Sequence, residues 1–463
     1  MHVVFVGGGS FRTLPIVRAA LGRKGGLHRG KITLVDFNLP RVETVGRLIM
    51  QTPEYRDADC TVTWTDKLDK ALPGADMVSV SFPVGSGKVC ALSDQACNQR
   101  GFIGGDQISP SGAFRSLTGG AVLLDIARRM EKHCPKAWLV DFANPVAVYS
   151  GMVNNHTRIR ALGVCGGMSN HRWDLTRLLF DRDEFRDEFK VSAAGINHLS
   201  ILLRGTWHGQ DIYKLLDRAL SRKDWKPCRI PTVPHSEKLI QLGLRLMAEM
   251  YRRFGKVVFS TEGDGHAHVF YDELGKSYLR SWKPASLAAI KKHGRMQAKS
   301  RRKVDLEFRA LLDGDLDDAF WAQKEKDGRF APDPHFPTSV IIRALSGNSR
   351  EWLAASRPNR GAVRGFKDRT VLEYSMILDR DGVHPEPDLE VPDAFHGLIT
   401  SLATHQTLLG DAIATQDPKL LAAALFAYPI YQNSTQAKAL WRDLLAIHAG
   451  EIPAEFQAAV DYF

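Results

Sequence analysis

Residues 3–10 have the sequence Val-Val-Phe-Val-Gly-Gly-Gly-Ser, and this stretch decides the fold of the first third of the chain. Its first four residues are β-branched or aromatic, which predicts a short buried strand. Three glycines then predict a tight turn, and residues 11–21 repeat apolar side chains at helical spacing. A second apolar strand over 32–35 ends in Asp36. This order of strand, glycine turn, helix, strand and acid predicts a dinucleotide-binding unit.

The glycine turn offers two kinds of contact to a nucleotide. Its backbone can approach a pyrophosphate closely, and the start of the next helix presents N–H groups to the negative charge. Asp36 can bond the ribose hydroxyls and would repel a 2′-phosphate, which favours NAD over NADP. Arg12 stands where a third glycine is usual, so a glycine-rich turn without a nucleotide is the alternative. The predicted cofactor-binding residues are Gly7, Gly8, Gly9, Ser10, Phe11, Arg12, Asp36, Pro83 and Asn144.

Strands and helices continue to alternate up to residue 165. The predicted elements are strands over 77–82, 138–142 and 159–164 and a helix over 117–132. Such alternation forms a mostly parallel, doubly wound sheet that binds ligands at the carboxyl ends of its strands. Pro83 and Asn144 lie just beyond two of those ends. We therefore expect residues 1–165 to form a Rossmann-like, NAD-binding α/β domain.

The pattern changes after residue 165. The predicted elements are strands over 191–203 and 257–259 and helices over 236–254, 287–312 and from 395 to the end. This mixture predicts a helix-rich α+β domain over 166–463 that covers the nucleotide and supplies the reacting and metal-binding groups.

The composition is that of a globular protein. The chain has 463 residues, a net charge of +10, 25% charged residues and 44% hydrophobic residues. It has no apolar run of the roughly 18 residues that a membrane span needs, no signal-peptide pattern, and six scattered cysteines. We expect a cytoplasmic protein with no membrane partner. The basic stretch 291–303 lacks interleaved aromatic residues, so we expect a solvated helix face and no nucleic-acid partner.

Two side chains suggest a metal site. Cys165 follows a predicted strand at the ligand-binding edge, and His198 lies in Gly195-Ile196-Asn197-His198. A thiolate and an imidazole can share a divalent cation and leave positions free for substrate oxygens. The alternatives are a buried small hydrophobe for Cys165 and a hydrogen-bonded core histidine for His198.

Two further segments carry candidate groups. Residues 262–268 place Asp264, a candidate general base, next to His266 among glycines, although a polar turn has the same composition. A loop over 105–115 ends in Arg115. Asn144 precedes a proline, which predicts an extended backbone and an amide that bonds a sugar hydroxyl or forms an Asx-turn.

In this order, the segments resemble the NAD-dependent glycoside hydrolases of family 4, whose fold is similar to that of lactate and malate dehydrogenases. The resemblance covers nearly the whole chain. It rests on Gly7-Gly8-Gly9-Ser10, Gly105-Asp106, Pro110 to Arg115, Leu124 to Arg128, Pro135 to Leu139, Ala143-Asn144-Pro145, Gly163-Val164-Cys165, Gly195 to His198, Tyr251 to Gly255, Asp264 with His266, and Tyr428-Pro429.

The resemblance implies a redox elimination on a hexoside. NAD⁺ takes a hydride from C3, a Mn²⁺-like ion on Cys165 and His198 holds the C2 and C3 oxygens, and Asp264 removes the C2 proton. The aglycone leaves, water adds, and NADH returns the hydride. The implied substrate-binding residues are Arg115, Asn144, Asn197 and His266. Dimers or tetramers built from the C-terminal helices are also implied.

One departure from the family concerns the acid for the leaving group. Gly166 follows the metal cysteine, where the family usually has Asp, Asn or His. His171 or a metal-bound water is a candidate substitute; the alternatives are a leaving group that needs no acid and an unusual cleaved bond. Arg12 and Arg115 suit an anionic hexose, although both suit nucleotide phosphates equally. The competing functions are an NAD-dependent dehydrogenase of a sugar or hydroxy acid and a non-catalytic NAD-binding protein.

Overall fold

The computed structural model describes all 463 residues except 233–236, 261–263, 269–286, 327–329, 348 and 431–433. For residues 167–170, 264, 287, 290 and 293 it describes the backbone alone.

The first part of the chain alternates strands with helices, as its apolar pattern predicts. Its strands are β1 (His2–Val6), β2 (Arg29–Val35), β3 (Asp59–Thr65), β4 (Met77–Val80), β5 (Trp138–Asp141) and β6 (Arg160–Gly163). Its helices are α1 (Thr13–Leu21), α2 (Leu39–Met50), α3 (Pro53–Arg56), α4 (Leu68–Ala71), α5 (Gly87–Gln99), α6 (Pro110–His133) and α7 (Val146–His156). The six strands pair in parallel in the order β3-β2-β1-β4-β5-β6.

The second part adds antiparallel strands and most of the helices. Its strands are β7 (Phe189–Ile196), β8 (Leu199–Trp207), β9 (Gln210–Asp211), β10 (Val258–Phe259), β11 (Glu351–Pro358), β12 (Val371–Asp379) and β13 (Gly382–Pro385). Its helices are α8 (Gly167–Phe180), α9 (Ile212–Leu220), α10 (Glu237–Phe254), α11 (Asp264–Ala267), α13 (Leu287–Leu311), α14 (Asp318–Lys326), α15 (Pro337–Leu345), α16 (Asp393–Thr415), α17 (Pro418–Ala427), α18 (Ser434–His448) and η4 (Ala454–Tyr462).

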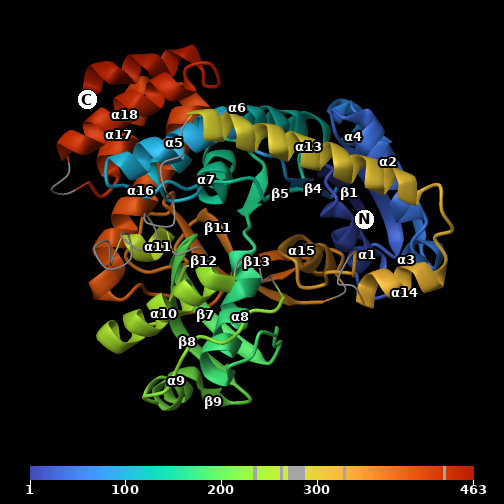
Figure 1. Ribbon diagram of the computed structural model, residues 1–463, viewed down its shortest axis with the longest axis horizontal. Coiled ribbons are helices and arrows are strands. Elements are labelled where there is room, and N and C mark those ends of the chain that lie inside the picture. Colours follow the sequence, from blue (N-terminus) through green and yellow to red (C-terminus); the bar gives the residue numbers. More distant parts are fainter. Residues whose placement is uncertain (233–236, 261–263, 269–286, 327–329, 348, 431–433) are drawn as a thin grey trace.

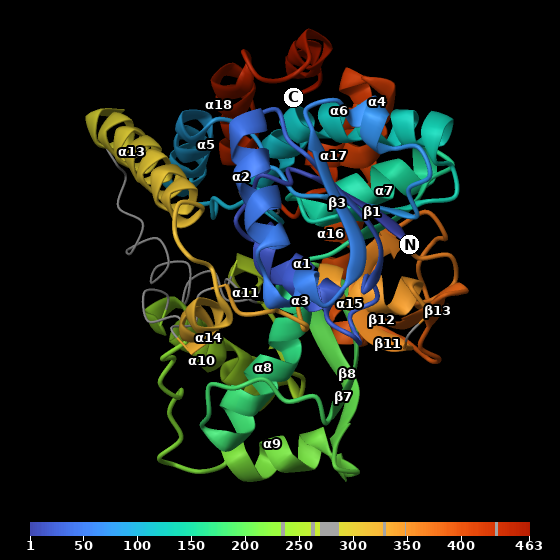
Figure 2. The same ribbon diagram turned by 90° about the vertical axis from the view of Figure 1, so that its right-hand side faces the viewer.

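One sheet joins the two parts. In the described part of the chain its 13 strands follow the order β10-β8-β7-β12-β11-β6-β5-β4-β1-β2-β3, with β13 on β12 and β9 on β8. The parallel half meets the antiparallel half where β6 pairs with β11 through Gly163 and Ser356. Helices α1 and α15 lie together on one face, and α6, α7 and α16 pack on the other (Figure 2). The α/β prediction with a mixed C-terminal part is confirmed.

The predicted strand over 191–203 is wrong in one respect. The chain turns back at Asn197 and His198, so the segment forms the antiparallel hairpin of β7 and β8. Asparagine and histidine tolerate left-handed backbone better than most residues, and His198 has a φ of 66°. Because apolar residues continue on both sides of this turn, the sequence pattern predicted one strand and not two. The sequence patterns also missed β3, β11, β12 and β13.

The predicted domain boundary at residue 165 lies inside this continuous sheet, between β6 and α8, and it stays a prediction. Among the described residues, no helix combines the length and the apolar character that a membrane crossing requires.

Candidate functional site

The glycine turn after β1 is built by backbone packing. The N–H groups of Gly7 and Gly8 both donate to the Val35 carbonyl at the end of β2, at 2.9 and 3.0 Å. Gly7 has a φ of 83°, and a Cβ there would lie 1.8 Å from the Ser81 carbonyl oxygen. A Cβ on Gly8 would lie 2.9 Å from the Phe5 carbonyl oxygen. Side chains are therefore excluded from this turn, which leaves its backbone accessible to a ligand.

Asp36 lies directly beside the turn. Its Oδ2 accepts the Gly9 N–H at 3.1 Å, and its Oδ1 accepts the Asn38 N–H at 2.9 Å. A Cβ on Gly9 would lie 2.7 Å from Asp36 Oδ2. The turn and the acid after the second strand therefore form one unit, as their sequence order predicts.

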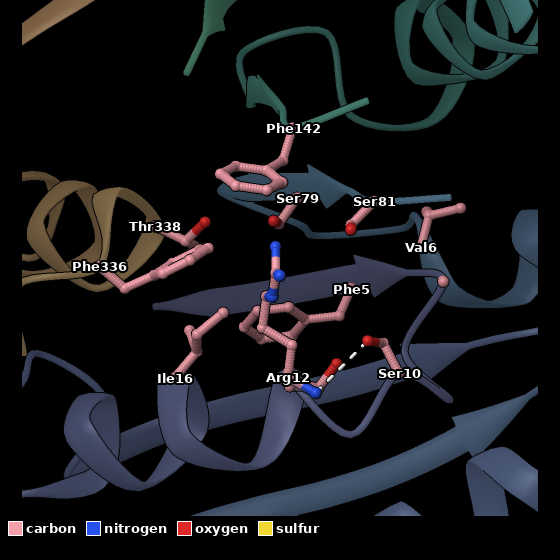
Figure 3. A pocket seen from close by; sticks show the side chains of 12 residues that line it. Phe5, Val6, Ser10, Arg12, Ile16, Ser79, Ser81, Phe142, Phe336 and Thr338 are labelled. Atoms are coloured by element: carbon pink, nitrogen blue, oxygen red, sulfur yellow. Dashed lines mark hydrogen bonds between the residues drawn. The ribbon is translucent and has the colours of Figure 1, made fainter. Parts of the chain in front are cut away.

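Arg12 occupies a pocket at the start of α1. The pocket lies between the ends of β1 and β4, the start of α1 and the start of α15. Figure 3 shows the Arg12 side chain pointing toward Ser79, near the rings of Phe142 and Phe336. Its guanidinium carbon lies 5.4 Å and 5.8 Å from the centres of these rings. Within the described residues Arg12 has no carboxylate partner, so its charge is available to an anion.

Helix α13, from the second part of the chain, covers the sheet edge that carries the glycine turn (Figure 1). In α13, the Phe308 ring stacks on Phe11, with centroids 3.4 Å apart. Asp305 of the same helix lies 3.2 Å from the Arg41 guanidinium. Sequence patterns missed this contact because the intervening distance along the chain is nearly 300 residues.

Cys165 and His198 meet at the ends of two non-adjacent strands. Cys165 follows β6, and His198 forms the turn between β7 and β8. The Cys165 Sγ lies 3.6 Å from His198 Nε2. The cysteine is half-buried, whereas His198 is 5% exposed. The sheet order explains the meeting, because β11 and β12 place β7 beside the parallel half.

A buried carboxyl group, which no sequence pattern indicated, supports the His198 turn. Glu373 on β12 lies opposite Gly195 in the register of β7. Its Oε2 accepts a 2.7 Å hydrogen bond from the Asn197 amide. Burial raises the pKa of Glu373, which is 3% exposed. Glu373 therefore positions Asn197, whose Oδ1 has no hydrogen-bond partner among the described residues, and the role of Asn197 in substrate binding stays a prediction.

The α11 segment packs directly on this turn. A Cβ on Gly265 would lie 2.0 Å from the His198 carbonyl oxygen. His266 is buried and its Nε2 lies 2.8 Å from the Val258 carbonyl, which suits a positioning role better than contact with a sugar. His268 Nε2 lies 3.2 Å from the Ile108 carbonyl and 3.3 Å from the Tyr428 hydroxyl. The Asp264 side chain lies outside the described residues, so its role as base stays a prediction.

His171 does not fit the role of leaving-group acid. Its ring stacks on Phe259 with centroids 4.1 Å apart and is 3% exposed. Burial lowers the pKa of His171 to about 3, so the imidazole is neutral at pH 7 and has no acidic proton to give. A Cβ on Gly166 would have no atom within 4 Å, so packing does not require glycine there.

Two other predicted substrate contacts have protein partners. Asn144, whose peptide bond to Pro145 is cis, donates to Asp106 Oδ2 at 2.8 Å and accepts from Gln107. Arg115 forms a 2.6 Å ion pair with Asp94 and is 8% exposed. The structure thus gives Arg115 no unbalanced charge for an anionic sugar. Pro83 lies exposed, three residues beyond the end of β4.

The described residues contain no cluster of three or more His, Cys, Asp or Glu side chains arranged for a metal. The thiol and imidazole are therefore a two-donor set, which leaves most positions of a bound cation to other ligands. Together with the glycine turn, they place a nucleotide-type loop and a soft metal-binding pair on one edge of the sheet.

Comparison with known proteins identifies the family. The model of the family 4 glycosyl hydrolases matches residues 2–180, and that of their C-terminal domain matches residues 193–431. The chain is 22% identical to the 6-phospho-beta-glucosidase of Escherichia coli, over 98% of this chain and 96% of the relative. It is also 22% identical to the alpha-galacturonidase of Thermoanaerobacter italicus, over 96% and 95%.

The fold is also similar to that of a solved structure. The 6-phospho-beta glucosidase of Thermotoga maritima, solved with manganese, NAD⁺ and glucose-6-phosphate, superposes with a TM-score of 0.72 at 18% identity over 98% of this chain and 99% of that one. The resemblance expected from the sequence motifs is confirmed. The chain belongs to the family 4 glycosyl hydrolases and is an enzyme that cleaves glycosidic bonds.

Proposed function

We propose that this glycosidase cleaves a hexoside by transient oxidation of its sugar ring, using a retained NAD⁺ and a divalent cation such as Mn²⁺. The observation that carries the proposal is the 3.6 Å approach of Cys165 Sγ to His198 Nε2 on the sheet edge that also holds the glycine turn. The relative from Thermotoga maritima, which binds manganese and NAD⁺, supports it.

The residues at the turn fit a dinucleotide. The backbone of Gly7–Gly9 excludes side chains, Asp36 lies beside it, and α1 starts without a side-chain cap at Arg12. The Arg12 guanidinium has no described carboxylate partner, which suits a pyrophosphate. When bound, NAD⁺ would accept a hydride and later return it.

The metal pair fits a catalytic cation. A thiol and an imidazole suit manganese-type ions less than carboxylates do, but they leave room for two sugar oxygens. When bound, the cation would act as a Lewis acid on these oxygens. Glu373 and Asn197 would hold His198 in its left-handed turn, and Gly265 would bring the Asp264 backbone against that turn. Asp264 is our candidate for the base that takes the C2 proton.

The site lacks a described acid for the leaving group. Gly166 has no side chain, and His171 is neutral because burial lowers its pKa to about 3. We therefore expect cleavage to depend strongly on the leaving ability of the aglycone. Nitrophenyl glycosides should react far faster than alkyl glycosides.

We further propose that the sugar carries a negative charge. The support is the naming of relatives as a phospho-glucosidase and a galacturonidase, the glucose-6-phosphate in the Thermotoga maritima structure, and the net charge of +10. A positive field speeds the encounter with an anionic substrate. Assembly into dimers or tetramers and a cytoplasmic location, supported by six free cysteines, belong to the same proposal.

The experiment is turnover in deuterium oxide. Nitrophenyl α- and β-hexosides in neutral, 6-phosphorylated and uronic forms are incubated with the enzyme, NAD⁺ and Mn²⁺. We expect the released sugar to carry deuterium at C2 and the NADH absorbance to remain flat. The hexoside form that the enzyme cleaves fastest identifies the charge of the substrate.

Turnover with no deuterium at C2 would exclude the proton-abstraction mechanism. The alternative of a net dehydrogenase predicts NADH that accumulates with the substrate and no nitrophenol release. Both signals come from the same reaction mixture, so one assay separates the two functions.

A further inference from the structure

Helix α13 spans the carboxyl edge of the parallel strands. Its Phe308 ring stacks on Phe11, just before α1, with centroids 3.4 Å apart. Further toward the N-terminus of α13, a Cβ on Gly87, the first residue of α5, would lie 3.7 Å from Gln297 Oε1. The helix also packs on α2, and Figure 1 shows it running past α5 toward α2. Because α1, α2 and α5 follow β1, β2 and β4, all three begin at the carboxyl edge that α13 crosses.

The helix crosses this edge at the point where the strand order reverses. Strand β1 pairs with β2 on one side and with β4 on the other. Dinucleotides bind in the crevice at such a point, with the pyrophosphate at the start of the helix that follows the first strand. Helix α13 therefore lies on the outer side of the proposed NAD⁺ site, and the glycine turn lies on its inner side.

Above the crevice, α13 does not rest on the protein surface. All residues from 294 to 303 are exposed, which corresponds to nearly three helical turns. A helix that lies directly on a protein surface buries a stripe of residues along one face, as α13 does at Phe308, which is 9% exposed. Solvent therefore reaches every face of the stretch 294–303, including the face toward the sheet, and leaves space there for a ligand.

The same stretch is strongly basic. Residues 291–303 contain seven lysines and arginines and no acidic residue. In the part of the chain that the structure describes, only Lys303 among these cations has an ion-pair partner, Glu307 at 3.7 Å. A dense and mostly unpaired positive charge beside the crevice favours a ligand that carries negative charge.

The helical period selects Arg301 among these cations. Phe308 and Gln297 mark the inner face of α13, because both contact the first part of the chain. Arg301 lies seven residues before Phe308 and four after Gln297, which places it within about 20° and 40° of these two side chains around the helix axis. Within the described residues Arg301 has no ion pair and its side chain makes no hydrogen bond. Its guanidinium is therefore an unpaired cation on the face toward the crevice.

We infer that Arg301 binds the pyrophosphate of NAD⁺ from the side opposite the glycine turn, an inference that rests on the proposed function. Guanidinium groups bind phosphate oxygens through paired, charge-assisted hydrogen bonds. The cofactor would then be enclosed between the backbone of residues 7–9 and a helix from the second part of the chain. Such enclosure slows dissociation, and the proposed reaction needs a cofactor that stays bound until the hydride is returned.

The test is calorimetric titration of the full chain with NAD⁺, with ADP and with adenosine at constant ionic strength. Arg301→Met should bind NAD⁺ and ADP about ten- to hundredfold more weakly than the unchanged protein, as expected for loss of hydrogen bonds to a charged group. Adenosine has no phosphate, so its affinity should be the same in both proteins. Because Arg301 is exposed, the Tm of the variant without ligand should equal that of the unchanged chain.

Lys299→Met is the matched control. Lys299 is also exposed and has no ion-pair partner among the described residues. It lies nine residues before Phe308, which places it about 180° away, on the outer face of the helix. The variant therefore loses the same charge from the same stretch, and its affinity for NAD⁺ should remain close to that of the unchanged protein.

The inference is overturned if Arg301→Met binds NAD⁺ as tightly as the unchanged protein, and in that case the proposed function stands. Equal weakening in Arg301→Met and Lys299→Met overturns it as well, because the effect would then come from the charge of the whole helix and not from one contact. Adenosine weakened as much as ADP would exclude the pyrophosphate as the bound group. If the unchanged protein binds no NAD⁺, the proposed function fails and the inference fails with it.

Discussion

The glycine turn and the thiol–imidazole pair lie on the same sheet edge but are built in opposite ways. The turn consists of residues 7–10 and Asp36, and its shape depends on the absence of side chains, since a Cβ on Gly7 would lie 1.8 Å from a carbonyl oxygen. The pair depends on two side chains whose strands are joined through β11 and β12. The backbone-built region should therefore fail in folding when altered, and the side-chain-built region should fail in chemistry.

The largest expected effect is loss of activity in Cys165→Ser. The hydroxyl is a much poorer ligand for a soft site than the thiolate, so we expect glycosidase activity to fall by about a thousandfold or more, a loss of roughly 4 kcal/mol of transition-state stabilisation. Because the change is nearly isosteric and Cys165 is half-buried, the free energy of unfolding should change by less than about 1 kcal/mol. Activity assays measure the loss of turnover, and urea unfolding measures the change in the free energy of unfolding. Substantial activity with Mn²⁺ would show that the thiol is not a ligand.

The next effect concerns Gly7→Ala. The new methyl group meets the Ser81 carbonyl and a left-handed backbone, so we expect the free energy of unfolding to fall by about 2–4 kcal/mol and NAD⁺ binding to weaken. Gly74→Ala is the control, because Gly74 has a φ of 73° and an open space around its Cβ. It should cost only the backbone strain, about 1 kcal/mol. Equal losses in the two variants would mean that close packing at the turn is not decisive.

The same contrast explains what the sequence predicted. Gly7, Gly9 and Asp36 act through local backbone geometry, which leaves a contiguous pattern, so the turn and five of the six parallel strands, all but β3, were predictable. Their chemistry made Cys165 and His198 candidate ligands of one cation, and the family resemblance strengthened the expectation that they meet.

Other parts of the site left no pattern at all. Glu373 became visible only in the register of β12 with β7, and the turn at His198 was hidden inside an apolar run. The partner of Arg115 lies on α5 and that of Asn144 lies in the loop before α6, and both segments reach these side chains through tertiary packing.

A smaller effect is expected at Glu373, which supports the thiol–imidazole pair without belonging to it. Glu373→Leu removes the acceptor of the Asn197 amide, and we expect the affinity for Mn²⁺ to fall by about 10- to 100-fold, as for other groups that orient a metal ligand. Glu373→Gln keeps an acceptor oxygen and should restore most of the affinity. The measurement is Mn²⁺ binding by calorimetry without substrate. Equal affinities in all three proteins would remove Glu373 from the site.

The smallest effect concerns His405, a histidine of the core outside the proposed site. Burial lowers the pKa of His405 to about 4, while the unfolded chain has a value of about 6.5. Between these values the unfolded state binds more protons, so the free energy of unfolding falls as the pH falls, by about 2 kcal/mol from pH 6.5 to 5. His405→Gln should flatten this slope in urea unfolding at several pH values. An unchanged slope would show that His405 is not held neutral.

The most direct test of the central claim is X-ray absorption at the manganese edge of the enzyme loaded with Mn²⁺ and NAD⁺. The account predicts one sulfur and one imidazole nitrogen among the neighbours of the ion, with the sulfur signal absent in Cys165→Ser. A coordination sphere of oxygen alone, unchanged in that variant, would contradict it.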